Sequence, residues 1–139
     1  MDNSLEELIT RLNVLVLEED FLDRAEEIIE EIGENPNAFD AVEPILVLME
    51  NNPEVDYGTP GPLVHFVEGF YKNGYEEKLT DSLTRKPIKH TVWMLNRIIN
   101  GSEGDTKEYL LKALDKVIFF PNLDASVVSL AQHFRTLHG

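Results

Sequence analysis

Apolar side chains recur every three or four residues along almost the whole chain, and this spacing is typical of helices buried on one face. Leu5, Leu8, Ile9 and Leu12 form the first such run. No stretch of useful length alternates apolar and polar residues as a strand does. The pattern predicts an all-α fold of about eight short helices in a single domain over residues 1–139. Short connections favour either a compact bundle or a short HEAT-like stack of helix pairs.

Capping residues, glycines and prolines predict where these helices begin and end. Ser4-Leu5-Glu6-Glu7 has the pattern of a capping box, so the first helix is expected to start at Ser4. Gly33 predicts the end of the second helix. Asn35-Pro36 predicts the start of the third, in which Pro44 indicates either a kink or a start delayed to about residue 40. The later helices are expected from Pro62, over Tyr75–Arg85, over His90–Asn100, from Asp105 and from about Asp124.

The chain has 139 residues and no cysteine. A chain of this length buries enough surface to fold without a metal or disulfide. No cofactor-binding motif is found, and no cofactor is expected. The absence of cysteine excludes disulfide scaffolds, Cys-ligated metal sites and thiol catalysis. No basic segment precedes an apolar one at the N-terminus, and no apolar run reaches the length of a membrane span. We therefore expect a cytoplasmic protein that does not enter a membrane.

The formal net charge of −14 is concentrated in the first part of the chain. Residues 1–58 contain 17 acidic and two basic side chains, a net charge of −15, whereas residues 59–139 have a net charge of +1. A Pro/Gly-rich loop, residues 51–61, lies where the charge changes, and loops of this length are often functional. Acidity of this kind disfavours nucleic acid or an anionic membrane as the partner.

Acidic side chains cover one face of the second predicted helix and continue into the turn before it and the loop at 51–61. A solvated face that confers solubility is the plain interpretation of such a pattern. The alternative is a surface that imitates the phosphates of nucleic acid and blocks a basic nuclease cleft, with Tyr57 as an aromatic anchor. The predicted partner-binding residues are Glu18, Glu19, Asp20, Asp23, Glu27, Glu30, Glu31, Asp56 and Tyr57.

Two short motifs invite a chemical interpretation. His65 and Glu68 lie three residues apart, but a di-iron site needs the opposite order and a second copy of the motif. Arg85 and His90 have the Arg-x4-His spacing of helical HEPN ribonucleases, in which the arginine holds a phosphate and the histidine transfers protons. Pro87 separates these two residues, so a helix-to-helix turn is the preferred interpretation. The sequence shows no P-loop, dinucleotide fingerprint, HExxH or GxSxG motif.

Asn96 and Arg97 interrupt the otherwise apolar helix predicted over His90–Asn100. A helix that is apolar on almost every side is expected at the centre of the fold. An arginine buried there needs a partner. We therefore predict a polar interaction that locks the packing of this helix.

Three segments together resemble the helical immunity proteins of bacterial polymorphic-toxin and contact-dependent growth inhibition systems: Gly61-Pro62-Leu63-Val64-His65-Phe66-Val67-Glu68, Arg85-Lys86-Pro87 and His90–Asn100. The resemblance covers roughly residues 61–115. It implies a small protein without enzymatic activity that binds the C-terminal domain of a cognate toxin and blocks its active site. No contact residue is carried over from the family. A helical adaptor without a toxin partner and an Arg-x4-His ribonuclease remain as alternatives.

Overall fold

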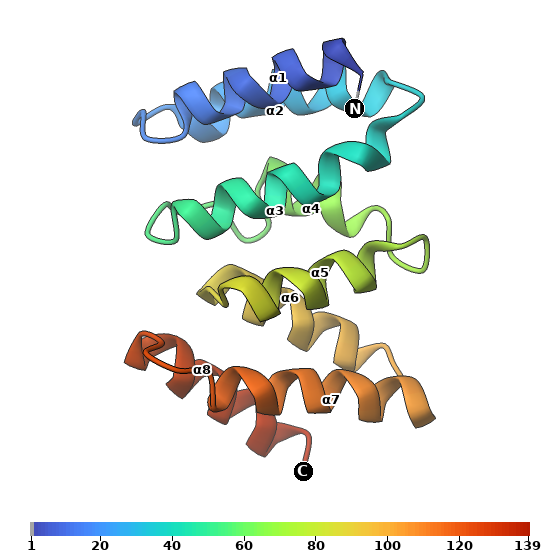
Figure 1. The fold of residues 1–139 in the computed structure, drawn as a ribbon, viewed down its shortest axis with the longest axis vertical. Coiled ribbons are helices and arrows are strands. Elements are labelled where there is room, and N and C mark those ends of the chain that lie inside the picture. The colour runs from blue at the N-terminus through green and yellow to red at the C-terminus, as the bar shows by residue number, and fades with distance from the viewer. Residues whose placement is uncertain (1) are drawn as a thin grey trace. The chain divides into compact units, whose positions relative to one another are not determined.

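The computed structural model describes residues 2–139, and within that range every regular element is helical (Figure 1). The predicted all-α fold and the prediction of about eight helices are confirmed. None of these helices is long and apolar enough to cross a membrane. The elements are α1 (Asn3–Leu15), α2 (Phe21–Glu34), the 3-10 helix η1 (Ala38–Ala41), α3 (Val42–Asn51), α4 (Pro62–Glu68), α5 (Tyr75–Arg85), α6 (Lys89–Asn100), α7 (Gly104–Ile118) and α8 (Ala125–Leu137).

The chain folds into two compact units, of which the first ends at Lys78 and the second is Leu79–Gly139. The division falls inside α5. The Pro/Gly loop therefore belongs to the first unit and connects α3 to α4 within it.

The first unit contains two helix pairs that pack against each other. The pairs are α1 with α2 and α3 with α4, and contacts also join α1 to α3 and α2 to α4 (Figure 1). The apolar stripe of α2, with Ala25, Ile28 and Ile32, is buried because it faces these neighbours. Within this unit the arrangement is a stack of helix pairs, which is one of the two predicted alternatives.

The second unit is a cluster in which α6, α7 and α8 each contact the other two. Val92, Met94, Leu95 and Ile99 of α6 are buried, in agreement with the prediction of a central apolar helix. Arg135 of α8 reaches across to α7, where its Nε lies 2.7 Å from the Oδ1 of Asp115.

Two predicted helix ends are wrong. Asp2, not Ser4, caps α1, because the Oδ1 of Asp2 accepts a hydrogen bond from the backbone N–H of Leu5 at 2.9 Å. This hydrogen bond holds the pKa of Asp2 below its ordinary value. Gly33 does not end α2, which continues to Glu34. Packing of the apolar stripe as far as Ile32 outweighs the weak helix propensity of glycine.

The start of α3 follows the second of the two predicted possibilities. After Asn35 the chain turns, forms η1 and enters α3 at Val42, so Pro44 lies in the first helical turn. The missing N–H of proline costs little there, since the first-turn N–H groups have no partner within the helix. Asn35 caps the turn rather than a helix, because its Oδ1 accepts from the N–H of Asn37 at 2.8 Å.

Candidate protein-binding surface

An open hollow of about 420 Å³ lies at one end of the first unit. Two segments form it, the turn between α1 and α2 and the loop after α3, and both lie at the same end of the unit (Figure 1). No lysine or arginine lines the hollow. Its lining residues are Glu18, Glu19, Asp20, Phe21, Leu22, Asp23, Val55 and Asp56.

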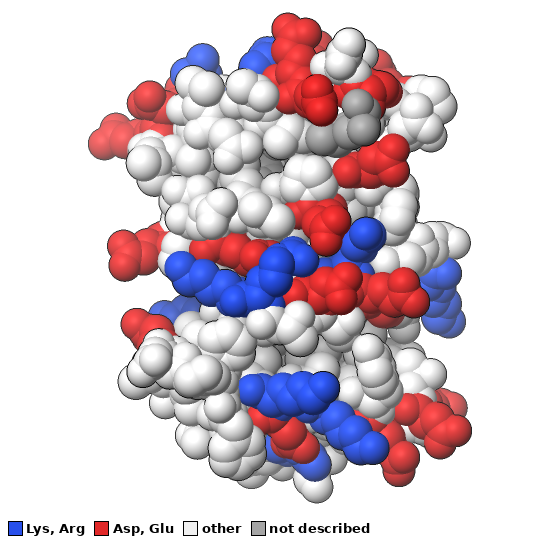
Figure 2. Space-filling model, viewed as in Figure 1, with Lys and Arg blue, Asp and Glu red and all other residues white. Residues whose placement is uncertain are grey.

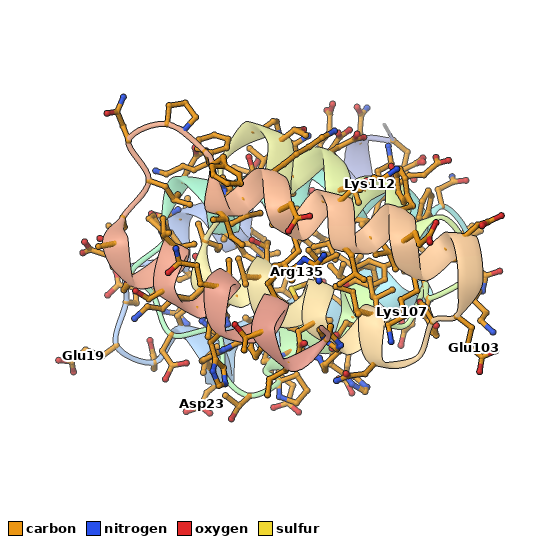
Figure 3. All side chains as sticks on the ribbon, turned by 90° about the horizontal axis from the view of Figure 1, so that it is seen from below. Glu19, Asp23, Glu103, Lys107, Lys112 and Arg135 are labelled. Atoms are coloured by element: carbon orange, nitrogen blue, oxygen red, sulfur yellow. The ribbon has the colours of Figure 1, made fainter. Side chains whose placement is uncertain are left out.

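A tight turn places the first group of carboxylates at the hollow. The N–H of Glu18 donates to the carbonyl of Leu15 at 2.9 Å, and the N–H of Phe21 donates to the carbonyl of Glu18 at 3.1 Å. The turn buries Phe21 and exposes the acidic side chains around it. Glu19 and Asp23 point away from the protein (Figure 3). Asp23 also lies in the first turn of α2, where the helix dipole favours negative charge.

Tyr57 anchors the loop on the other side of the hollow. Its side chain is fully buried, and its hydroxyl donates a hydrogen bond to the backbone carbonyl of Asn52 at 2.8 Å. Its ring packs edge-on against Phe21, with centroids 6.4 Å apart. Burial raises the pKa of Tyr57. The prediction that Tyr57 contacts a partner is therefore corrected, because the aromatic ring joins the loop to α2 inside the core.

Close backbone packing gives this loop a defined shape. The Oδ1 of Asp56 accepts from the N–H of Gly58 at 2.8 Å, and Gly58 has a φ of +86°. A Cβ atom on Gly61 would lie 1.8 Å from the carbonyl oxygen of Tyr57, so only glycine fits there. Together with buried Tyr57, these contacts hold Val55 and Asp56 beside the hollow.

The nine predicted binding residues thus separate into three groups. Five carboxylates line the hollow. Glu27, Glu30 and Glu31 are exposed farther along α2, and Glu31 lies 3.5 Å from the Nη1 of Arg11. Tyr57 is buried. The hollow therefore brings together carboxylates from two segments more than 30 residues apart in sequence.

Two apolar residues at the same end of the unit escaped the sequence interpretation. Val14 is 72% exposed and Leu17 is 79% exposed. Both lie off the stripe of Leu5, Leu8 and Leu12, which is the one signal that distinguishes them. An exposed leucine that directly precedes three acidic residues has no role in the core of the fold.

The difference in net charge between the two structural units is larger than the difference between residues 1–58 and residues 59–139. The first unit contains 20 acidic and four basic side chains, a net charge of −16, whereas the second has six acidic and eight basic ones, +2. Figure 2 shows acidic side chains of the first unit at the end that holds the α1–α2 turn and also at the opposite end. Such a field attracts cationic partners and raises their association rates.

The residues with a chemical interpretation differ in how far they are exposed. His65 is exposed and Glu68 is half-buried. Nowhere in residues 2–139 do three His, Cys, Asp or Glu side chains lie close enough together to hold a metal ion. Arg85 is exposed, whereas His90 is only 9% exposed and its ring packs edge-on against Trp93 at 5.5 Å.

One of the two polar residues that interrupt α6, Asn96, contacts the segment that follows α8. Arg97 is exposed, so the prediction of a buried arginine is wrong. The Oδ1 of half-buried Asn96 instead lies 2.7 Å from the Nε2 of His138, which follows α8. Desolvation, with the nearby charges of Lys107 and Arg135, lowers the pKa of His138.

Comparison with models of protein families, with curated proteins and with solved structures found no significant match to this chain.

Proposed function

We propose that this protein is an immunity protein, a non-enzymatic inhibitor that binds the C-terminal domain of a cognate bacterial toxin and covers its active site. Two independent observations support the proposal. One is the resemblance of residues 61–115 to helical immunity proteins. The other is the acidic hollow of the first unit, which carries the physical argument.

A toxin that cleaves nucleic acid binds phosphates in a cleft lined with lysine and arginine. The hollow offers such a cleft five carboxylates and no positive charge of its own. Carboxylates spaced around a recess take the place of phosphates and exclude the substrate. The partner is therefore a basic protein domain, and the inhibition is steric and electrostatic rather than chemical.

The charge of the first unit predicts how the complex forms. A net charge of −16 attracts a basic domain over a Debye length of roughly 10 Å at 0.1 M salt. Because steering acts on the encounter, added salt is expected to lower the association rate far more than it raises the dissociation rate. An association rate that does not depend on salt would contradict the electrostatic mechanism.

Co-expression tests the function itself. The toxin domain encoded beside this gene should stop bacterial growth when expressed alone, and growth should recover when this protein is produced with it. The two proteins should also purify together. Failure of both rescue and co-purification would leave the adaptor as the better description.

Charge reversal locates the contact. Glu19→Lys with Asp23→Lys introduces two positive charges at the hollow and should weaken toxin binding by roughly a hundredfold at low salt, because like charges then meet across the interface. Asp105→Lys with Glu108→Lys is the matched control, since it makes the same change in net charge at two exposed residues of α7 in the second unit. Equal loss of binding in both proteins would indicate a general effect of net charge.

A further inference from the structure

The end of the first unit that carries the hollow also presents apolar surface to solvent. Val14 belongs to the last turn of α1, and Leu17 directly precedes Glu18, which lines the hollow. Their exposed fractions are 72% and 79%. Exposed apolar side chains beside a recess are typical of interaction surfaces, because a partner that covers them removes apolar area from water.

The lining of the hollow combines apolar and acidic side chains. Leu22 and Val55 are half-buried and contribute apolar area, and the carboxylates around them are exposed. An arginine side chain has the matching two parts, an apolar stem and a cationic head. Its guanidinium binds carboxylates through paired hydrogen bonds and loses its hydration more readily than the ammonium of lysine.

The size of the hollow also favours a side chain over a bare metal ion. Its volume is about 420 Å³. In the described chain no three carboxylates or imidazoles approach closely enough to share one metal ion. Carboxylates with this wider spacing suit a cationic group several ångströms across.

We infer that Val14, Leu17 and the hollow form one docking site for a basic protein segment. An arginine of that segment enters the hollow, and a neighbouring apolar side chain covers Leu17. The inference deepens the proposed function and rests on it, because it takes the acidic surface to be the binding surface. It adds the apolar contact that supplies short-range affinity, whereas Glu27 and Glu30 farther along α2 act at longer range.

Three short synthetic peptides test this site on the full chain. One has the order arginine, leucine, arginine; the second replaces leucine with serine; the third replaces both arginines with glutamate. The first peptide should shift the amide NMR signals of residues 17–23 and 55–56 before any others. The serine peptide should bind roughly three- to tenfold more weakly, because it lacks the apolar contact. The glutamate peptide should produce no shifts.

Leu17→Ser removes the apolar partner from the protein side. It should weaken the first peptide by the same factor and leave the serine peptide unaffected. Phe119→Ser is the matched control, because Phe119 is 84% exposed and lies beyond α7 in the second unit. Both positions are exposed, so circular dichroism should report an unchanged fold.

The outcomes separate this inference from the proposed function. Equal affinity of the arginine peptides, or shifts spread evenly along α2, would overturn the docking site even if the protein neutralises its toxin. Localised binding that depends on Leu17 would support the site even if no toxin is neutralised. In that case the immunity function alone would be wrong.

Discussion

At the scale of single residues, Tyr57 shows how a side chain that looks suited to binding serves the fold instead. Its ring packs against Phe21 and its hydroxyl bonds the carbonyl of Asn52. The ring contact connects the loop to α2, and the hydroxyl bond joins two parts of the loop itself. The effect on the hollow is indirect, through the position of Val55 and Asp56.

Substitution of Tyr57 separates these two contributions. Tyr57→Phe keeps the ring and removes one hydrogen bond, so we expect a loss of about 1 kcal/mol in the free energy of unfolding. Tyr57→Ala also leaves a cavity and should cost roughly 3–5 kcal/mol. Urea unfolding monitored by circular dichroism measures both. Equal losses would show that the ring contributes nothing to stability.

Position 61 requires glycine because the backbone of Tyr57 passes close to it. A side chain there would collide with the backbone carbonyl of Tyr57, 1.8 Å from the Cβ position. Gly61→Ala is expected to destabilise the protein by several kcal/mol, or about 2 if the loop moves to relieve the clash. The urea midpoint reports the loss. In the second case, the NMR signals of residues 55–56 at the hollow should shift as well.

His138 predicts a pH dependence in the second unit. Its pKa in the folded protein lies below the ordinary value, so the unfolded chain binds a proton at higher pH than the folded one. Stability from this group is therefore present above about pH 6.5 and is lost as the pH falls towards the folded pKa. Titration of the imidazole by NMR measures the shift. Lys107→Gln should raise the pKa, and an unchanged value would exclude the charge contribution of Lys107.

At the scale of elements, local pattern predicted the helices themselves better than it predicted where the first three of them begin and end. Periodicity predicted Tyr75–Arg85 as it stands in α5, and the predicted helices over His90–Asn100 and from Asp105 each begin one residue from the observed start. The first three helices were less well predicted at their ends. There the outcome depended on which of several competing cap residues the packed chain used.

Substitution of the residue that caps α1 tests the start of this helix. Asp2→Ala removes the acceptor for the N–H of Leu5 and should lower the urea midpoint, whereas Ser4→Ala should not. The pKa of Asp2 is lowered in the folded protein, so its contribution is present above about pH 4 and is lost as the pH falls through the folded pKa. The difference between wild type and Asp2→Ala should vanish at low pH. A larger effect from Ser4→Ala would restore the capping box.

Substitution of Gly33 is expected to raise the stability of the protein, whereas substitution of Asp2 lowers it. It lies within α2, and a Cβ atom there meets nothing within 4 Å. Gly33→Ala should therefore stabilise the protein by about 0.5–1 kcal/mol, since alanine restricts the unfolded chain and favours the helix. Thermal unfolding measures the gain. Destabilisation would mean that the helix ends at Gly33 after all.

At the scale of the whole molecule, the separation of charge is expected to lower stability and, under the proposed function, to favour binding. The acidic side chains of the first unit repel one another, and this repulsion opposes folding. Glu26 and Glu30, one turn apart on α2, are an example. The same field attracts a basic partner, so stability and binding are expected to respond in opposite directions to a loss of negative charge.

Glu30→Lys tests this opposition in one protein. Relief of repulsion should raise the urea midpoint at low salt, by a few tenths of a kcal/mol in unfolding free energy. The same substitution should slow association with a basic toxin domain. Sodium chloride should raise the midpoint of the wild type and reduce the difference between the two proteins. A variant that is both less stable and slower to bind would contradict this account.

Sequence by itself determined the helical class, the approximate number of helices and the position of the negative charge, because each depends on neighbours within a few turns. Only the tertiary structure decided that Tyr57 is buried, that Leu17 is exposed and that Asp20 and Asp56 line the same hollow. These outcomes depend on how α1, α2 and the loop after α3 pack together. Packing brings together residues that are far apart in sequence, and the spacing of neighbouring residues does not predict which of them will be in contact.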